Sequence, residues 1–234
     1  MITSQFLALG LIWYIVFLFS TTCHEGAHSL VAKLGGDPTA FEGGQVSLNP
    51  IPHIRRSPFG LVVVPILSYF AAHWMIGWAS APYNPEWQER YPHRAAWMAL
   101  AGPAANFSLM LLAALAIHIG MLAGVFVPGT FGFTHIVAAT VPGYAGFAAT
   151  FLSILFVLNL LLGTFNLLPV PPLDGNTAIT LLMPENAARR FLQWFHRQSL
   201  GMIGLVLAWY LFDRIFEVIF RFAVVALYTG YSAG

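Results

Sequence analysis

The sequence has few charged residues: of its 234 residues, 10 are Lys or Arg and 9 are Asp or Glu, together 8%. Soluble domains carry about 25%, so charge this sparse excludes a soluble fold of this length. The net charge of +1 argues against a nucleic-acid partner, because such a partner requires a basic face. A single cysteine, Cys23, excludes an internal disulfide. Apolar residues make up 58% of the chain, which is typical of an integral membrane protein.

The uncharged stretches predict where the chain crosses the membrane. No Asp, Glu, Lys or Arg occurs before Glu25, and residues 57–81 and 95–173 also have none. A spanning helix needs about 20 predominantly apolar residues, and a region rich in Gly and Pro divides the longest stretch into two. We therefore predict spans near residues 4–33, 59–80, 95–126 and 142–166, a helical piece at 173–183 and a long helix at about 190–228.

These elements predict an all-α polytopic membrane protein, a bundle of about five to six transmembrane helices in a single domain, residues 1–234. Its core would be about residues 5–183, followed by a C-terminal helical segment at about 190–228. The positive-inside rule does not settle the orientation. The first basic loop carries Lys33, Arg55 and Arg56, and the second carries Arg90 and Arg94. Simple alternation of spans puts these two loops on opposite faces of the membrane, unless residues 59–80 are re-entrant.

The motif HEGAH at residues 24–28 is H-E-x-x-H within a predicted helix. Its spacing puts His24 and His28 on one helical face, where both can bind a zinc ion. Glu25 lies beside the first histidine and can accept a proton from a water molecule at that ion. The alternative is a polar helix end at the interface, but ionisable residues at membrane depth are costly and indicate a function.

Two histidines leave a tetrahedral zinc short of a third protein ligand. Asp174 ends the longest uncharged stretch, in NLLPVPPLDG at residues 166–175, where three prolines in four positions prevent a helix. Non-helical backbone at membrane depth is tolerated only where it is buried in protein or lines a wet cavity. We predict that a helix is broken here and that Asp174 is the third ligand. The alternative is that Asp174 caps a helix at 175–183.

In combination, these motifs resemble those of the site-2 protease family of intramembrane zinc metalloproteases. The resemblance rests on HEGAH, on NLLPVPPLDG and on GPAAN at residues 102–106, which is similar to the family's G-P-x-x-N. NPIPH at residues 49–53 is similar to a loop of small bacterial and archaeal members. The resemblance implies that His24, His28 and Asp174 bind one zinc ion per chain and that Glu25 is the general base.

The chain departs from the family pattern at a few places. Asn176 stands where Gly or Ser is common, and Arg55 and Arg56 stand where an acid often follows the loop that contains His53. We expect a small member without a PDZ domain, and therefore without that means of screening substrates.

Three further residues are candidates for contacts with substrate or transition state. Asn106 lies one helical turn after Gly102 and can donate to an oxyanion or substrate backbone, or else bridge packed helices. Asn166, which begins the segment that leads into the prolines, can bind substrate or cap its helix. His53 can be a fourth ligand or a gate, or a histidine that forms a hydrogen bond within its own loop.

One loop has the pattern of a β-hairpin. Residues 39–42 and 45–48 flank Gly43 and Gly44, and two short runs around a Gly-Gly pair indicate a hairpin. An unpaired strand edge is costly in lipid. We therefore predict a small β-hairpin near the active site, whose edge receives an unwound substrate. The alternative is that the extended segment Pro169–Pro172 holds the substrate as an added strand.

The sequence thus predicts an intramembrane zinc metalloprotease that hydrolyses peptide bonds of membrane-embedded substrates, with zinc-activated water and Glu25 as general base. The expected partners are a peptide or membrane-protein substrate and the lipid bilayer, with no nucleic acid. We expect a multi-pass protein of a prokaryotic cell membrane. The alternative is a zinc-binding membrane protein without protease activity. A transporter needs further His, Asp or Glu along its path, whereas residues 95–173 offer only His118 and His135. A non-catalytic binder would have lost Glu25 or a ligand.

Overall fold

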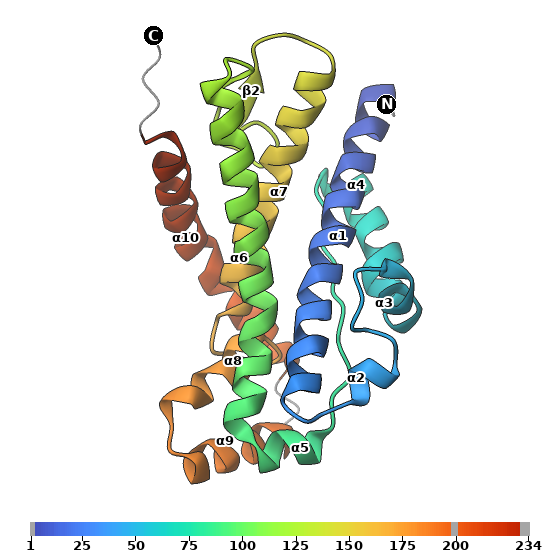
Figure 1. Cartoon of the computed structure of the whole chain (residues 1–234), viewed down its shortest axis with the longest axis vertical. Coiled ribbons are helices and arrows are strands. Elements are labelled where there is room, and N and C mark those ends of the chain that lie inside the picture. Colours follow the sequence, from blue (N-terminus) through green and yellow to red (C-terminus); the bar gives the residue numbers. More distant parts are fainter. Residues whose placement is uncertain (1–2, 198–200, 230–234) are drawn as a thin grey trace.

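Residues 3–197 and 201–229 are described by a computed structural model, in which the chain is mostly helical (Figure 1). Three helices are long and apolar enough to cross a membrane, and they pack on one another. They are α1 (Ser4–Leu34), α6 (Pro92–Leu122) and α7 (Tyr144–Asn166). They correspond to the first, third and fourth predicted spans.

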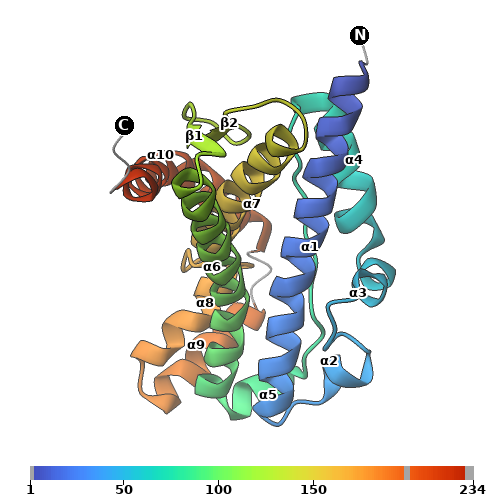
Figure 2. The ribbon, with the colours of Figure 1, turned by 45° about the horizontal axis from the view of Figure 1, so that its top comes forward.

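Shorter elements and the long helix α10 surround these three helices. α2, α3 and α4 lie on the opposite side of α1 from α6 and α7, as two views show (Figures 1 and 2). The bounds of the remaining elements are α2 (Thr39–Glu42), α3 (Pro50–Arg56), η1 (Phe59–Val63), α4 (Val64–Ala72), α5 (Pro85–Arg90), β1 (Phe126–Pro128), β2 (Val137–Ala139), α8 (Asp174–Ala178), η2 (Ile179–Leu182), α9 (Glu185–Arg197) and α10 (Gly201–Tyr228).

The hairpin predicted at residues 39–48 is wrong. Asp37 accepts hydrogen bonds from the backbone N–H and the hydroxyl of Thr39, so the first of the two runs begins the short helix α2. Gly44 has a φ of 73°, and its N–H donates to the Phe41 carbonyl at 2.9 Å. The Gly-Gly pair therefore ends a helix, the usual role of glycine at a helix C-terminus, and does not turn a hairpin.

The two-stranded antiparallel sheet lies elsewhere, between α6 and α7. β1 pairs with β2 in the register Phe126↔Ala139, Val127↔Ala138 and Pro128↔Val137. Leu122, where α6 ends, is 20 residues from Gly102, so the sheet is about 30 Å along the helix axis from the GPAAN segment.

The span predicted at residues 59–80 is also wrong. Only residues 59–72 are helical, across η1 and α4, and this length is short for a crossing. His73 ends α4 in the left-handed conformation, with a φ of 62°, and the Trp78 N–H donates to the Gly60 carbonyl at 3.1 Å. The chain therefore folds back beside its own start.

The folded-back segment brings the residues that follow α1 to the same end of the bundle as the second basic loop, which carries Arg90 and Arg94. The Gly35 carbonyl, at the end of α1, accepts from Trp87 Nε1 and from Arg94, each at 3.1 Å. Asp37 Oδ2 accepts from the Asn84 N–H at 2.7 Å. Simple alternation of the two basic loops across the membrane therefore does not hold.

The C-terminal region contains two helices rather than the predicted single helix over residues 190–228. α9 packs against α5, α6 and η2, whereas α10 packs against α7. Phe165 of α7 contacts Phe212 of α10 with ring centroids 4.9 Å apart. The two helices therefore cover different parts of the bundle.

Candidate metal centre

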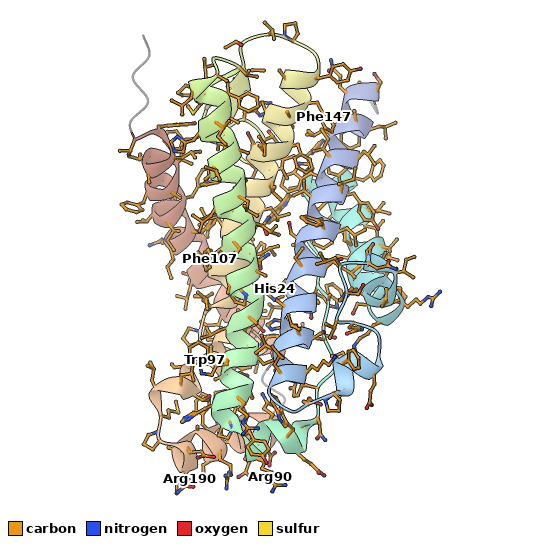
Figure 3. The ribbon with its side chains drawn as sticks, viewed as in Figure 1. His24, Arg90, Trp97, Phe107, Phe147 and Arg190 are labelled. Carbon is orange, nitrogen blue, oxygen red and sulfur yellow. The ribbon has the colours of Figure 1, made fainter. Side chains whose placement is uncertain are left out.

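His24 (labelled in Figure 3) and His28 lie one turn apart on α1 and face α6, where they contact Asn106 and Met98. Both are buried, at 7% exposure each. Their Nε2 atoms are 3.0 Å apart, because the spacing of four residues stacks the two side chains on one helical face. The two predicted histidine ligands therefore point to the same place.

Asp174 completes this cluster from α8. Its Oδ2 lies 3.1 Å from His24 Nε2 and 3.2 Å from His28 Nε2. Asp174 is the first residue of α8, whose N-cap position is occupied by Leu173, and its Oδ2 accepts no hydrogen bond from the backbone of that helix. The carboxylate is therefore directed at the histidines, as the ligand hypothesis requires and the capping alternative does not.

Gly175 explains how Asp174 reaches this position. A Cβ at residue 175 would lie 2.2 Å from the Leu167 carbonyl oxygen and 2.4 Å from that of Leu168. Only glycine allows the start of α8 to pack this closely on the backbone that follows α7. The glycine next to Asp174 thus sets the position of the carboxylate.

The other ring nitrogen of each histidine fixes the tautomer. His28 Nδ1 donates to the Met98 carbonyl at 2.7 Å, and His24 Nδ1 donates to Asn106 Oδ1 at 2.6 Å. A neutral imidazole carries one N–H, so both Nε2 atoms keep their lone pairs. Histidine ligands of metals are typically held in this way.

Three hydrogen-bond acceptor atoms thus converge, and none of the three carries a hydrogen. Asp174 Oδ2 is buried without a hydrogen-bond partner, an arrangement that is costly unless a cation is present. Ligand atoms about 2.0 to 2.1 Å from a tetrahedral zinc lie about 3.3 to 3.4 Å apart, close to the observed 3.0 to 3.2 Å. Two imidazoles and a carboxylate are ligands that suit zinc, so the residues fit this ion.

Gly102 leaves room for the cluster. A Cβ at this residue would lie 2.4 Å from His28 Nε2 and 2.5 Å from His24 Nε2. Within GPAAN, the glycine thus allows α6 to approach the two histidines closely.

Asn106 is fully buried, and both ends of its amide are used. Oδ1 accepts from His24, and Nδ2 donates to Asn159 Oδ1 on α7 at 2.8 Å. In this arrangement the amide orients a candidate ligand and bridges α6 to α7. The oxyanion contact remains a prediction.

Glu25 follows His24 on α1 and is buried, at 6% exposure, and its role as general base remains a prediction. Asn166 Nδ2 donates to the Leu162 carbonyl of its own helix at 2.9 Å. His53 Nε2 donates to the Ser47 carbonyl at 3.0 Å, which is the local hydrogen bond given as the alternative to a ligand role. Neither Asn166 nor His53 belongs to the three-residue cluster, so their contacts with substrate remain predictions.

Two groups were not identified from the sequence, the Met98 carbonyl and the Asn159 side chain. A backbone carbonyl leaves no trace in a sequence. Asn159 is the only Asn or Gln between residues 145 and 165. A polar side chain within an apolar span indicates a function, so the sequence did carry a signal for this residue.

Comparison with known proteins identifies the family of this chain. A protein of Bacillus subtilis (strain 168) described as "Putative zinc metalloprotease YwhC" is 32% identical over 204 residues, which cover 83% of this chain and 79% of that protein. No solved structure matches the chain. The sequence model of Peptidase family M50 matches residues 12–211. The predicted resemblance is thereby confirmed, and the chain belongs to peptidase family M50, the site-2 protease family.

Proposed function

We propose that this metallopeptidase is an intramembrane zinc protease that hydrolyses peptide bonds of membrane-embedded substrates. The observation that carries the proposal is the convergence of three acceptor atoms, from His24, His28 and Asp174, within 3.2 Å of one another. An Asp174 oxygen without a donor, inside an apolar bundle, is the partner that a bound cation requires.

The depth of the cluster supports action within the membrane. His24 precedes Leu34, the last residue of α1, by ten residues, and therefore lies about 15 Å along the helix from that end. Figure 3 shows His24 between the end of the bundle that carries Arg90 and Arg190 and the end that carries Phe147. A peptide bond cleaved here lies within the hydrocarbon layer, if α1 crosses it.

The residues of the chain divide the chemistry among them. His24, His28 and Asp174 would hold zinc, which supplies a Lewis acid for the scissile carbonyl and lowers the pKa of water. Glu25 accepts the proton of the attacking water and passes it to the leaving amine. Asn106 and the Met98 carbonyl hold the two imidazoles with Nε2 directed at the centre.

A helical substrate has to unwind before cleavage, because its carbonyls are engaged in hydrogen bonds. The proline-rich segment between α7 and α8 is a poor template for strand addition. Its three prolines have no N–H, while the Val170 N–H donates to Leu168 and the Leu173 N–H donates to Val170. The segment Pro169–Pro172 is therefore not the strand to which an unwound peptide adds.

The charges suggest an orientation. Lys33, Arg90, Arg94 and Arg190 are exposed and lie at the end of the bundle where α1 ends and α6 begins. By the positive-inside rule, this end faces the cytoplasm.

The test combines metal content with proteolysis. Purified wild-type protein in detergent should contain one zinc per chain and cleave fluorescein-labelled casein or a reconstituted single-span peptide. Glu25→Gln, nearly identical in shape, should keep the zinc and lose the cleavage, because an amide cannot act as a base. Zinc-free wild-type protein, or equal cleavage by Glu25→Gln, would contradict the proposal.

The alternative of a transporter finds less support. Within residues 3–197 and 201–229, the structure shows one cluster of potential metal ligands, whereas transport requires a succession of sites. Uptake of zinc into proteoliposomes by the Glu25→Gln variant would favour the transporter instead.

A further inference from the structure

The hydrogen bonds behind His24 continue beyond Asn106 to Asn159, which the proposed function leaves without a role. Asn159 is fully buried on α7. Its Nδ2 donates to the Leu155 carbonyl and to Ser20 Oγ, each at 2.8 Å. Its Oδ1 accepts from Asn106 Nδ2 at the same distance. Asn159 therefore links α7 to both helices that meet at the candidate metal centre.

This chain of hydrogen bonds has a fixed direction. The Leu155 carbonyl can only accept, so Asn159 must turn its nitrogen toward Leu155 and its oxygen toward Asn106. The Asn159 oxygen also can only accept, so Asn106 turns its nitrogen to Asn159 and its oxygen to His24. That oxygen, 2.6 Å from His24 Nδ1, requires the ring hydrogen on Nδ1.

We propose that Asn159 is a positioning residue of the metal centre: acting through Asn106, it holds His24 in the tautomer whose Nε2 can bind a metal. The inference rests on the zinc centre proposed above. Without Asn159, no other group in this series of hydrogen bonds distinguishes the two orientations of the Asn106 amide. A reversed amide presents its nitrogen to His24 Nδ1 and favours the tautomer with hydrogen on Nε2, which cannot bind zinc.

Ser20 takes no part in setting this direction. A hydroxyl can donate or accept, so Ser20 Oγ is compatible with either orientation of Asn159. The backbone carbonyl of Leu155 alone determines the orientation, one helical turn before Asn159.

The test measures zinc affinity at constant pH, by competition with a chelator. Asn159→Leu removes both ends of the amide with little change in volume. We expect zinc affinity to fall about 10- to 100-fold, as is typical when a group that orients a metal ligand is lost. The visible absorption bands of the cobalt-substituted protein should change as well, because the His24 ring is no longer held in one orientation at the metal. Ser153→Ala is the matched control: Ser153 is equally buried on α7 but interacts with the Val137 N–H, so this variant should keep wild-type affinity.

Two further variants separate positioning from folding. In Asn159→Ser, the hydroxyl can still donate to the Leu155 carbonyl, as Ser29 does to Glu25 on α1, but it is too short to reach Asn106. Its zinc affinity should fall as in Asn159→Leu, and it carries the test where Asn159→Leu is not recovered folded. In an Asn106→Leu background, Asn159→Leu should cause no further loss, because both residues act through one chain.

The outcomes for the two proposals differ. A wild-type protein that binds no zinc refutes the zinc centre itself. If the wild type binds zinc and the folded Asn159 variants bind it equally well, the zinc centre stands and the positioning role of Asn159 is refuted.

Discussion

His24 and His28 lie one turn apart on the same helix, yet they are oriented by different means. His28 donates to the backbone carbonyl of Met98, whereas His24 donates to the side chain of Asn106. The Met98 carbonyl is fixed by the backbone of α6, so no substitution removes it directly. The orientation of His24 depends on two amides, and one substitution can change it.

This difference between the two histidines shows that a sequence specifies which side chains meet more directly than it specifies how each side chain is oriented. The H-E-x-x-H spacing specifies which side chains meet, and this follows from the period of one helix. The direction of each ring depends on how α1, α6 and α7 pack. Variants of the two histidines and of their partners should therefore differ in a predictable order.

Removal of ligands should have the largest effect and should not distinguish the two histidines. His24→Ala, or His28→Ala combined with Asp174→Ala, leaves two ligands or one, too few to retain zinc against a chelator. We expect zinc below detection by elemental analysis after gel filtration. His53→Ala is the control and should retain zinc, because His53 lies outside the cluster. Stoichiometric zinc in the double variant would contradict the ligand assignment.

Gly102→Ala should affect both histidines equally by a different route. Its Cβ would lie 2.4 to 2.5 Å from both Nε2 atoms, so the rings must move while Asn106 and Met98 hold them. We expect zinc affinity to fall at least as far as on loss of an orienting group, about 100-fold, in a chelator competition. Ala101→Gly, at the neighbouring residue, controls for changes in the flexibility of α6. Wild-type affinity in Gly102→Ala would show that the helices separate easily here.

Asn106→Leu should affect His24 alone. The Nδ1 hydrogen of His24 loses its acceptor, while that of His28 keeps the Met98 carbonyl, so a partial loss of zinc affinity of about 10-fold is expected. Asn106→Asp retains an oxygen acceptor and should retain most of the affinity. If both variants lose zinc equally, the volume and helix packing of Asn106 matter more than its acceptor.

The outcome of the sequence predictions follows the same division. α1, α6 and α7 were predictable, because long apolar runs have few alternatives in a membrane protein. The cluster of His24, His28 and Asp174 was predictable, because charges are so rare in this chain. The local hairpin was not, because the role of Gly43 and Gly44 depends on Asp37, whose carboxylate starts a helix before them.

The crossing predicted at residues 59–80 failed for a related reason. Hydropathy does not show that the chain reverses at His73, nor that Gly77 packs on Gly60, where a Cβ would lie 2.3 Å from the Gly60 carbonyl oxygen. Asn159 was overlooked because its partner is 53 residues away on another helix. Contacts between helices, rather than patterns within one, account for each of these differences.

Met98→Leu should have the smallest effect, and it tests whether the orientation of His28 depends on the side chain of Met98. The Met98 side chain is buried, at 8% exposure, but His28 donates to its backbone carbonyl, which the substitution leaves in place. Exchange of Met for Leu nearly conserves volume and typically costs less than about 1.5 kcal/mol of stability. Zinc affinity in the chelator competition should therefore remain at the wild-type value, while Asn106→Leu in the same assay loses about 10-fold. A comparable loss in Met98→Leu would mean that the side chain of Met98 holds α6 against His28, and the two histidines would then be equally open to substitution. An unchanged affinity leaves His28 insensitive to the side chain of its partner, because its acceptor belongs to the backbone of α6.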